Sequence, residues 1–155
     1  MRKRWWTMII IFALCLIGIA GTHTGNANAD KVYIVPLQNE VEKGLSNFLK
    51  RAIKTAEKDG AEAIIFDINT PGGAVDAADE IGNTFANTEL ETIAFVNNRA
   101  LSAGAFISLN ADEIYMVPGA TMGAAAVITS DGNAADKKAQ SYWLANMQKA
   151  AESSG

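Results

Sequence analysis

The sequence predicts an α/β domain with a largely parallel β-sheet and crossover helices. Short segments rich in β-branched residues alternate along the chain with longer segments whose apolar residues recur at helical spacing. Two expected strands, 61–68 and 92–96, hold continuous apolar runs, which are typical of strands buried on both faces of a sheet. This alternation favours parallel pairing, because each crossover helix returns the chain to the same end of the sheet.

The first strand and helix are expected directly after the N-terminal region. Segment 32–37 is short and β-rich, and Pro36 favours an edge or end position because proline cannot donate to a sheet ladder. Segment 41–60 has one apolar face at helical spacing, and Gly60 fits its C-terminal stop. The chain therefore begins its α/β pattern with an edge strand and a long amphipathic helix.

The remaining elements continue the same alternation. The segment "NTPGG" (69–73) is expected to be a turn, because it joins a strand to a helix and contains Pro-Gly-Gly. The other expected elements are the strands 61–68, 92–96 and 113–117 and the helices 74–88, 103–111 and 134–154. The Ala- and Gly-rich stretch 119–126 is expected to pack tightly rather than to be disordered.

The N-terminal region contains the parts of a secretory signal peptide in their usual order. A basic start, "MRKRWW", precedes an apolar stretch at 8–20 and the small residues Ala27 and Ala29. We expect residues 1–29 to be this signal, and 30–155 to be the folded domain. The alternative is an uncleaved membrane anchor, although the apolar stretch is short for a spanning helix. Either way, the domain is expected to be exported and to face the extracytoplasmic side.

Composition excludes several classes of function for the domain after residue 29. It keeps ten of the 13 Lys and Arg residues and all 17 Asp and Glu residues, a net charge of −7 that disfavours nucleic-acid binding. The single cysteine, Cys15, and the single histidine, His23, both precede the expected cleavage point. Cysteine catalysis, a Ser-His-Asp triad and a histidine-based zinc site are therefore excluded, and we expect neither a metal nor a cofactor.

Two segments after neighbouring strands are expected to meet at one edge of the sheet. "NTPGG" follows the strand 61–68, and "NNRALSAG" (97–104) follows the strand 92–96. Ligands gather at the carboxyl ends of strands in open α/β sheets. Backbone N–H groups near Gly72, Gly73 and Ala103 would then surround Ser102, an arrangement that suits a nucleophile with an oxyanion site.

Each of these signals also has a purely structural interpretation. A Pro-Gly-Gly segment after a strand is most often only a turn. A serine before Ala-Gly at a helix start is most often an N-cap, because the side chain of serine satisfies free N–H groups there. The two segments together, in the setting of a parallel sheet, favour the catalytic interpretation.

Without histidine, the base for a serine nucleophile would be a lysine in its uncharged form. The lysines after Ser102 are Lys137, Lys138 and Lys149, and composition does not choose between them. A lysine on a helix is usually a solvated surface charge. Lys138 shares a helical face with Tyr142 four residues later, so an apolar neighbour makes it the better candidate for burial.

Two long motifs carry a resemblance to a known family. "FDINTPGGAVDAADEI" (66–81) and "NRALSAGAFISLNADEIYMVPGATMGAA" (98–125) resemble the NfeD family of membrane-bound, ClpP-class serine proteases. That family belongs to the ClpP/crotonase superfamily, which includes signal peptide peptidase A. The resemblance covers essentially all of 30–155 and implies a ClpP/crotonase-like fold.

The resemblance also implies roles for particular residues. Ser102 is the implied nucleophile and Lys138 the implied base, with Tyr142 as the aromatic residue that follows it. Gly72 and Gly73 form the implied oxyanion site, with Ala103 beside the nucleophile. A Ser-Lys dyad of this kind needs no histidine. The implied function is cleavage of apolar peptide segments in membrane proteins, with stomatin-like partners and assembly into a homo-oligomer.

The sequence departs from the family pattern at two places. Many relatives carry a proline after the Gly-Ala-Ala element, which "AAAVI" (124–128) lacks, and relatives continue beyond the point where "AESSG" ends. We therefore expect the protease domain to be C-terminally incomplete here. Two alternative functions remain open: a non-catalytic scaffold for membrane proteins, and, less well supported for an exported chain, an acyl-CoA enzyme of the crotonase type.

Overall fold

A computed structural model describes residues 31–129 and 131–154 of the chain. The expected signal segment, with Cys15 and His23, lies outside the described residues. Within the described part, none of the helices combines the length and the apolar character needed to cross a membrane.

The centre of the domain is a parallel sheet with the strand order β1-β2-β3-β4. Its strands are β1 (Val32–Val41), β2 (Ala63–Gly73), β3 (Glu91–Leu101) and β4 (Glu113–Met116). A short fifth strand, β5 (Thr121–Gly123), pairs in parallel with the end of β3. The predicted α/β architecture with a parallel sheet is therefore confirmed, as is the edge position of the strand that contains Pro36.

β1 and β3 are longer than expected and continue through Val41 and Leu101, so the first part of "NNRALSAG" is strand rather than turn. Two further features of the sheet also differ from the sequence-based expectation. β2 continues through Gly73, so "NTPGG" is the extended end of a strand rather than a turn. β5 was not predicted, because three residues in a Gly- and Ala-rich stretch carry too little β-propensity to identify a strand. Both differences lie at the carboxyl edge of the sheet, where β2, β3 and β5 end close together.

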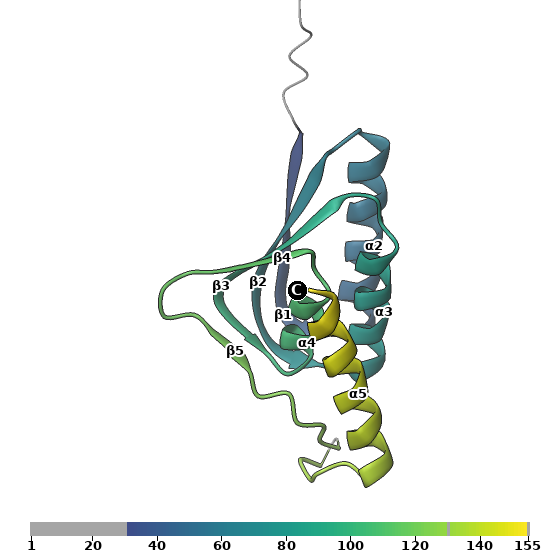
Figure 1. Cartoon of the computed structure of the whole chain (residues 1–155), viewed down its shortest axis with the longest axis vertical. Coiled ribbons are helices and arrows are strands. Elements are labelled where there is room, and N and C mark those ends of the chain that lie inside the picture. The colour runs from purple at the N-terminus through teal and green to yellow at the C-terminus, as the bar shows by residue number, and fades with distance from the viewer. Residues whose placement is uncertain (1–30, 130, 155) are drawn as a thin grey trace, which may run out of the picture.

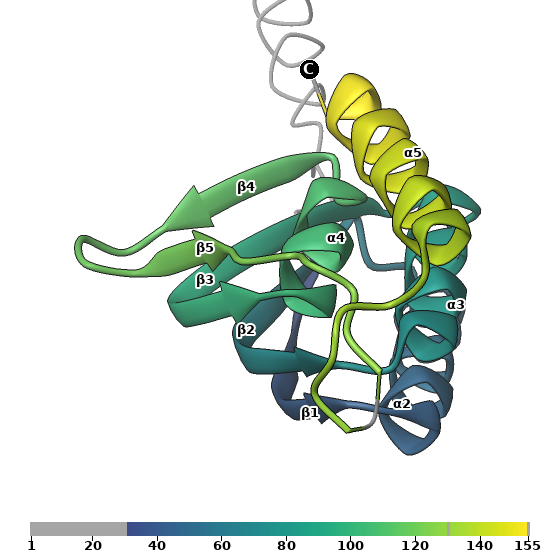
Figure 2. The same cartoon turned by 90° about the horizontal axis from the view of Figure 1, so that it is seen from below.

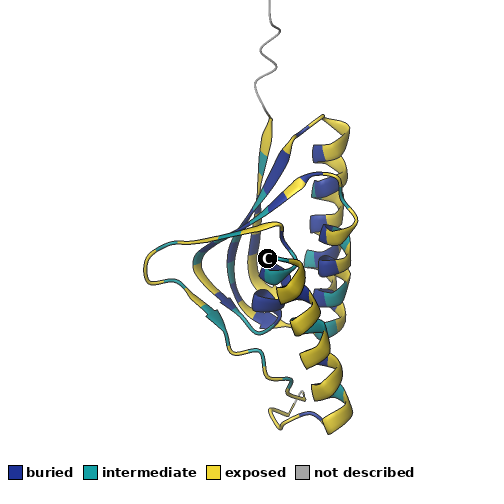
Figure 3. Cartoon of the chain, in the orientation of Figure 1, coloured by how far each residue is buried: buried dark blue, intermediate teal, exposed yellow. Residues whose placement is uncertain are grey.

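In the described part of the chain, four helices accompany the sheet. They are α2 (Lys43–Lys58), α3 (Val75–Ala86), the short α4 (Ala103–Leu109) and α5 (Lys137–Ser153). Figures 1 and 2 show α2, α3, α4 and α5 on one side of the sheet. The buried side chains gather between this helical layer and the strands, as the dark blue segments of Figure 3 show.

The expectation that β2 and β3 are buried on both faces is wrong for the described chain. One row of their side chains, which includes Phe66, Ile68, Ala94 and Val96, is fully buried under the helices. The opposite row is only half-buried. It lines an open apolar depression of about 530 Å³ with Ile34 and Tyr115, whose side chains are exposed. The continuous apolar run therefore reflects a sheet whose second face has no cover within the described residues.

Aromatic packing joins the sheet to the helical layer. The rings of Phe66 in β2 and Phe85 in α3 stack with their centroids 4.1 Å apart, and both side chains are buried. Close packing of this kind makes the core sensitive to any loss of volume.

We predict that Phe66→Ala lowers the free energy of unfolding by about 3–5 kcal/mol, because it leaves a cavity under α3. Ile34→Ala is the matched control, since Ile34 lies on the uncovered face of the sheet and should cost less than about 1 kcal/mol. Urea denaturation of both variants measures the difference. Equal losses would show that Phe66 is not in a packed core.

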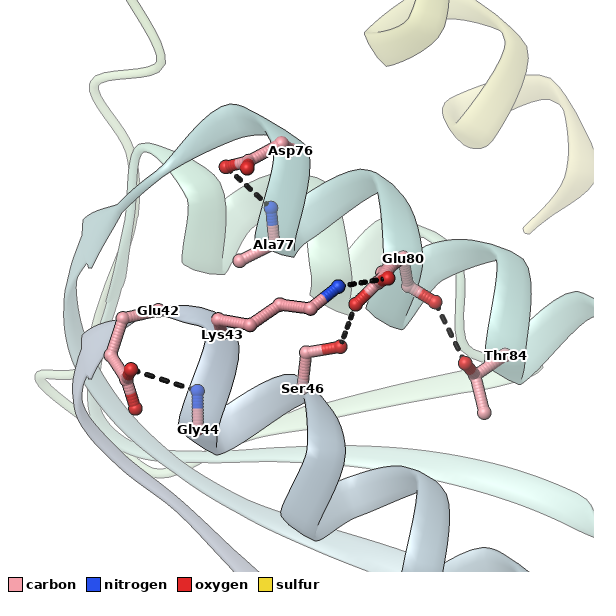
Figure 4. A network of polar contacts seen from close by, with 8 residues as sticks. All are labelled: Glu42, Lys43, Gly44, Ser46, Asp76, Ala77, Glu80 and Thr84. Atoms are coloured by element: carbon pink, nitrogen blue, oxygen red, sulfur yellow. Dashed lines mark hydrogen bonds and ion pairs between the residues drawn. The ribbon is translucent and has the colours of Figure 1, made fainter.

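A polar clamp holds α2 against α3 (Figure 4). Glu80 of α3 forms an ion pair with Lys43, and its second oxygen accepts a hydrogen bond of 2.5 Å from the hydroxyl of Ser46. The hydrogen bond from Lys43, followed by that from Ser46, lowers the pKa of the Glu80 carboxyl. The clamp is therefore strongest when Glu80 is ionised.

We predict that Glu80→Gln lowers the urea midpoint at neutral pH and that the difference from the wild type disappears in acid. The pKa of Glu80 is lower in the folded state than in the unfolded state. Its contribution is therefore present above the ordinary carboxyl range and is lost as the pH falls through the lowered pKa. Urea titrations at several pH values test this. A difference that stayed constant down to low pH would contradict it.

Candidate active site

Ser102 occupies the corner where β3 ends and α4 begins. Its backbone has φ 51° and ψ −117°, a conformation that non-glycine residues rarely adopt and that costs roughly 1–3 kcal/mol. Its N–H donates to the carbonyl of Gly123 in β5 at 2.7 Å, and its carbonyl accepts from Ala105 in the first turn of α4. The corner is therefore fixed from both sides by backbone hydrogen bonds.

The side chain of Ser102 does not cap α4 within the described chain. Ser102 holds the N-cap position, yet its hydroxyl accepts no hydrogen bond from the helix. The structural interpretation of this serine as an ordinary capping residue therefore does not describe the geometry. The hydroxyl is left available at a half-buried position.

Gly72 approaches Ser102 so closely that no side chain fits between them. A methyl group added at Gly72 would lie 2.6 Å from the Cβ of Ser102 and 2.8 Å from the carbonyl oxygen of Leu101. It would also lie 3.2 Å from the backbone nitrogen of Ala103. With a φ of 102°, Gly72 is in the region that favours glycine. The structure thus brings Gly72, Ser102 and Ala103 together, although 30 residues separate Gly72 from Ser102 in the sequence.

Hydrogen bonds tie the end of β2 to its own Thr70 and to β1. The N–H of Gly72 donates to the hydroxyl of Thr70 at 3.1 Å. The N–H of Ala74 donates to the carbonyl of Val41 in β1 at 2.8 Å. Val41 is the partner of Gly73 in the ladder between β1 and β2, and it accepts the N–H of the following residue, Ala74. A side chain at Gly73 would collide with the backbone of Val41, so this position also requires glycine.

A small cavity of about 50 Å³ opens beside the serine. Its lining residues are Gly73, Val75, Ser102, Ala103, Ala126, Val127, Ile128 and Trp143. An adjacent groove of about 630 Å³ shares the residues 126–128 and Trp143 with the cavity and continues along α5 past Leu144 and Met147. The apolar groove therefore adjoins the cavity beside Ser102.

Lys138 is exposed, which contradicts the expectation that it is buried beside Tyr142. Tyr142 is itself exposed, and its hydroxyl donates to Asp79 at the surface of α3 at 2.9 Å. Of the described residues that line the cavity at Ser102, none is a lysine, whereas Lys137 lines the adjacent groove. The described single chain therefore does not bring Lys138 into the cavity with Ser102.

Trp143 is the site residue that the sequence analysis missed. Its ring packs against Phe106 of α4, with the centroids 4.8 Å apart, and its indole N–H donates to the carbonyl of Ala125 at 2.7 Å. It is one of the two buried residues that anchor α5, with Ala150, and it forms one wall of the cavity. The spacing of Ala139, Trp143, Met147 and Ala150 on one face of α5 was the available signal for it.

The described residues, 31–129 and 131–154, hold no cluster of His, Cys, Asp or Glu side chains suited to a metal ion.

Comparison with known proteins identifies the family of the chain. The model of the NfeD1b N-terminal domain family matches residues 31–155. The chain belongs to this family. The predicted NfeD resemblance is therefore confirmed, and the NfeD1b N-terminal domain accounts for all of the described residues.

Two curated relatives are longer membrane proteins. Membrane protein NfeD1b of Bacillus subtilis is 50% identical over 143 residues, which cover 91% of this chain and 32% of the relative. The membrane-bound protease PH1510 of Pyrococcus horikoshii is 32% identical over 132 residues, which cover 80% of this chain and 30% of the relative. The chain thus spans about a third of the length of these relatives.

Solved structures of a protease share the fold of this NfeD1b N-terminal domain. Two mutants of the 1510-N membrane-bound stomatin-specific protease each superpose with a TM-score of 0.75 at 30% identity and cover 79% of this chain. The match covers 63% and 60% of those chains. One carries a serine-to-alanine change, and the other carries a lysine-to-alanine change and holds a substrate peptide.

We predict that Gly72→Ala destabilises the domain by about 1–3 kcal/mol more than Gly119→Ala does. Both glycines have positive φ, but an added methyl at Gly119 would meet nothing within 4 Å, whereas at Gly72 it would meet Ser102. Gly119→Ala thus reports the backbone strain alone, and the excess in Gly72→Ala reports the close approach. Urea denaturation of the two variants measures the difference, and equal losses would contradict the contact.

Proposed function

We propose that this domain is the serine peptidase of a membrane-associated protein, with Ser102 as nucleophile and Lys138 as general base. The observation that carries the proposal is the conformation of Ser102. A non-glycine residue is held at φ 51° on a strand-to-helix corner, with its hydroxyl unused by the helix and facing a cavity. Such strain persists where the surroundings enforce it, and it is frequent at catalytic sites.

The oxyanion donors in this proposal are backbone N–H groups of Gly73 and Ala103, and Gly72 is the close-approach residue between them. The N–H of Gly72 is already used by Thr70. The position of Gly73 and Ala103 in the lining of the cavity beside Ser102, and the nearness of Ala103 to Gly72, support the pair. Backbone donors aimed at the developing negative charge lower the barrier, and each is worth about 3 kcal/mol.

The proposed reaction begins with transfer of the hydroxyl proton of Ser102 to the uncharged amine of Lys138. The oxygen of Ser102 forms a bond to the substrate carbonyl carbon, whose C–N bond then breaks as the lysine returns the proton to the leaving amine. Water deprotonated by the same lysine attacks the resulting ester. Ser102 leaves with that proton, which restores the free enzyme and releases the carboxylic acid product.

Because Lys138 is exposed in the single chain, the proposed function requires the domain to assemble into an oligomer. A lysine acts as a base only when uncharged, and exclusion of water favours its uncharged form. An apolar groove with the exposed residues Ile128 and Leu144 lies beside α5. A second copy of the chain packed on this groove would shield this end of the helix from water. We therefore propose a homo-oligomer in which this end of α5 is covered and the side chain of Lys138 reaches Ser102.

The proposed substrates are apolar peptide segments of membrane proteins, and the proposed partner is a stomatin-like protein. The apolar lining of the groove beside the cavity supports an apolar substrate. One relative is a membrane-bound protease, and the matching structures are of a stomatin-specific protease. The proposed location is the extracytoplasmic side of the cell membrane, which follows from the expected signal segment at residues 1–29.

We predict that Ser102→Ala and Lys138→Ala in the full-length protein each reduce cleavage of an apolar peptide by at least about 10²-fold, while the circular dichroism spectrum stays unchanged. Lys137→Ala is the matched control, because it removes the neighbouring lysine, and it should stay within a few-fold of the wild type. Labelling by a fluorophosphonate probe should require Ser102.

The alternative results have distinct meanings. Loss of cleavage in Lys137→Ala and not in Lys138→Ala would move the role of base to the neighbouring residue. A folded full-length protein that neither cleaves peptides nor reacts with the probe would overturn the peptidase proposal and favour the non-catalytic scaffold.

A further inference from the structure

We infer that Thr70 is a positioning residue that couples the oxyanion strand to the nucleophile corner. This inference rests on the proposed function, since it concerns the same site. Thr70 lies two residues before Gly72 in β2, and its side chain is completely buried. Its hydroxyl bonds to the ends of β1 and β2, and its methyl group contacts the start of α4.

The hydroxyl of Thr70 bridges β1 and β2 at the point where their backbone pairing is interrupted. The register between β1 and β2 shifts between Gln38 and Glu40, and Asn39 takes a φ of 67° at this bulge. The Thr70 hydroxyl accepts the N–H of Gly72 at 3.1 Å and donates to the carbonyl of Asn39. It therefore stands in for the direct backbone hydrogen bond that the bulge removes, and it fixes the peptide plane of Gly72.

The N–H of Gly72 belongs to the Pro71–Gly72 peptide, and the N–H of Gly73 belongs to the peptide that follows it. The bond from Gly72 to Thr70 holds the backbone before this second peptide, and the bond from Ala74 to Val41 holds it after, so together they restrict the Gly73 N–H that the proposal directs at Ser102. Without the hydroxyl, Gly72 would have a buried N–H with no partner, and a glycine pair has little intrinsic resistance to rotation of its peptide planes. Loss of the hydroxyl therefore disturbs the oxyanion donor and leaves Ser102 itself in place.

The methyl group of Thr70 acts on α4. A side chain at Gly104, the second residue of α4, would collide with the Cγ2 of Thr70, so the methyl group lies directly against the helix start. Ser102 is two residues before Gly104, so this contact sets the distance between β2 and the nucleophile. One buried side chain thus holds both halves of the proposed site in register.

The first test compares Thr70→Val, which keeps the shape and removes the hydroxyl, with Thr70→Ser, which keeps the hydroxyl, in the full-length protein. Peptide turnover by Thr70→Val should fall by about 10²-fold, mainly in kcat, because the donor is misplaced in the transition state. Thr70→Ser keeps the hydroxyl but loses the methyl contact with α4, so its turnover should fall by at most about tenfold. Equal turnover of Thr70→Val and wild type, or equal impairment of both variants, would overturn the inference.

Thr92→Val is the matched control for simple loss of stability. Thr92 is also buried, and its hydroxyl likewise bridges two groups: it donates to the carboxylate of Asp112 at 2.6 Å and accepts from the Asp112 N–H at 3.0 Å. Thr92→Val should therefore shift the urea midpoint as Thr70→Val does but leave kcat within about 3-fold of the wild type. A comparable fall in kcat in both variants would mean that Thr70 has only a structural role.

A second measurement separates this inference from the peptidase proposal. Amide hydrogen exchange at Gly72 should be about tenfold or more faster in Thr70→Val than in wild type, and Thr70→Ser should restore protection. If the wild type shows no peptidase activity, the proposed function fails, and exchange at Gly72 alone decides whether Thr70 fixes this peptide. Unchanged exchange in Thr70→Val would overturn the inference.

A compensating pair covers the case in which Thr70→Val does not fold. Gly104→Ala introduces the collision with the Thr70 methyl group, and Thr70→Ser removes that methyl group. The double variant Thr70→Ser/Gly104→Ala should therefore be more stable and more active than Gly104→Ala alone. If the second change brings no recovery, the proposed contact between Thr70 and α4 is contradicted.

Discussion

The close approach of two backbones at Gly72 and Ser102 is the constraint on which the site depends. The space between them excludes even a methyl group, so the end of β2 and the β3–α4 corner have one relative position. The parallel sheet makes this meeting possible, because neighbouring parallel strands end at the same edge. The hydrogen bond from Ser102 to β5 then ties a third segment to the same point. The fold thus holds the backbone atoms around Ser102 in nearly fixed positions. The proposed base, by contrast, is a side chain on α5.

The two halves of the proposed dyad differ in how firmly the structure holds them. Ser102 lies at a corner braced by the sheet and by α4, whereas Lys138 lies near the first turn of α5, whose buried anchors are Trp143 and Ala150. The first of these anchors lies more than one helical turn beyond Lys138. The proposed base therefore lies on a helix whose buried anchors are distant from it. Such an arrangement makes the environment of the amine depend on what covers the start of α5.

Much of the fold was predictable from the sequence, since it is encoded by local periodicity. The positions of α2, α3 and α5 follow from apolar residues at helical spacing, and the strands follow from short β-rich runs. The uncovered face of the sheet was not predictable, because an apolar run reports hydrophobicity and does not report what lies above it. Strand β5 was missed because its three residues form a strand only by pairing with β3 and have no periodic signal of their own.

At the site, Ser102 and the glycines were predicted from their motifs and from the rule that neighbouring parallel strands end at the same edge of a sheet. The strained φ of Ser102, the use of the Gly72 N–H by Thr70 and the exposure of Lys138 depend on tertiary contacts, which no local pattern contains.

The position of Trp143 in the chain has a consequence for synthesis on the ribosome. The nucleophile corner uses β2, β3, α4 and β5, all of which emerge before α5. The wall formed by Trp143 is added only afterwards, when its ring reaches Phe106 and its indole reaches Ala125. A growing polypeptide therefore forms the corner at Ser102 before the wall that Trp143 adds to the cavity. Under the proposed function, the site becomes complete only when the last described helix has folded.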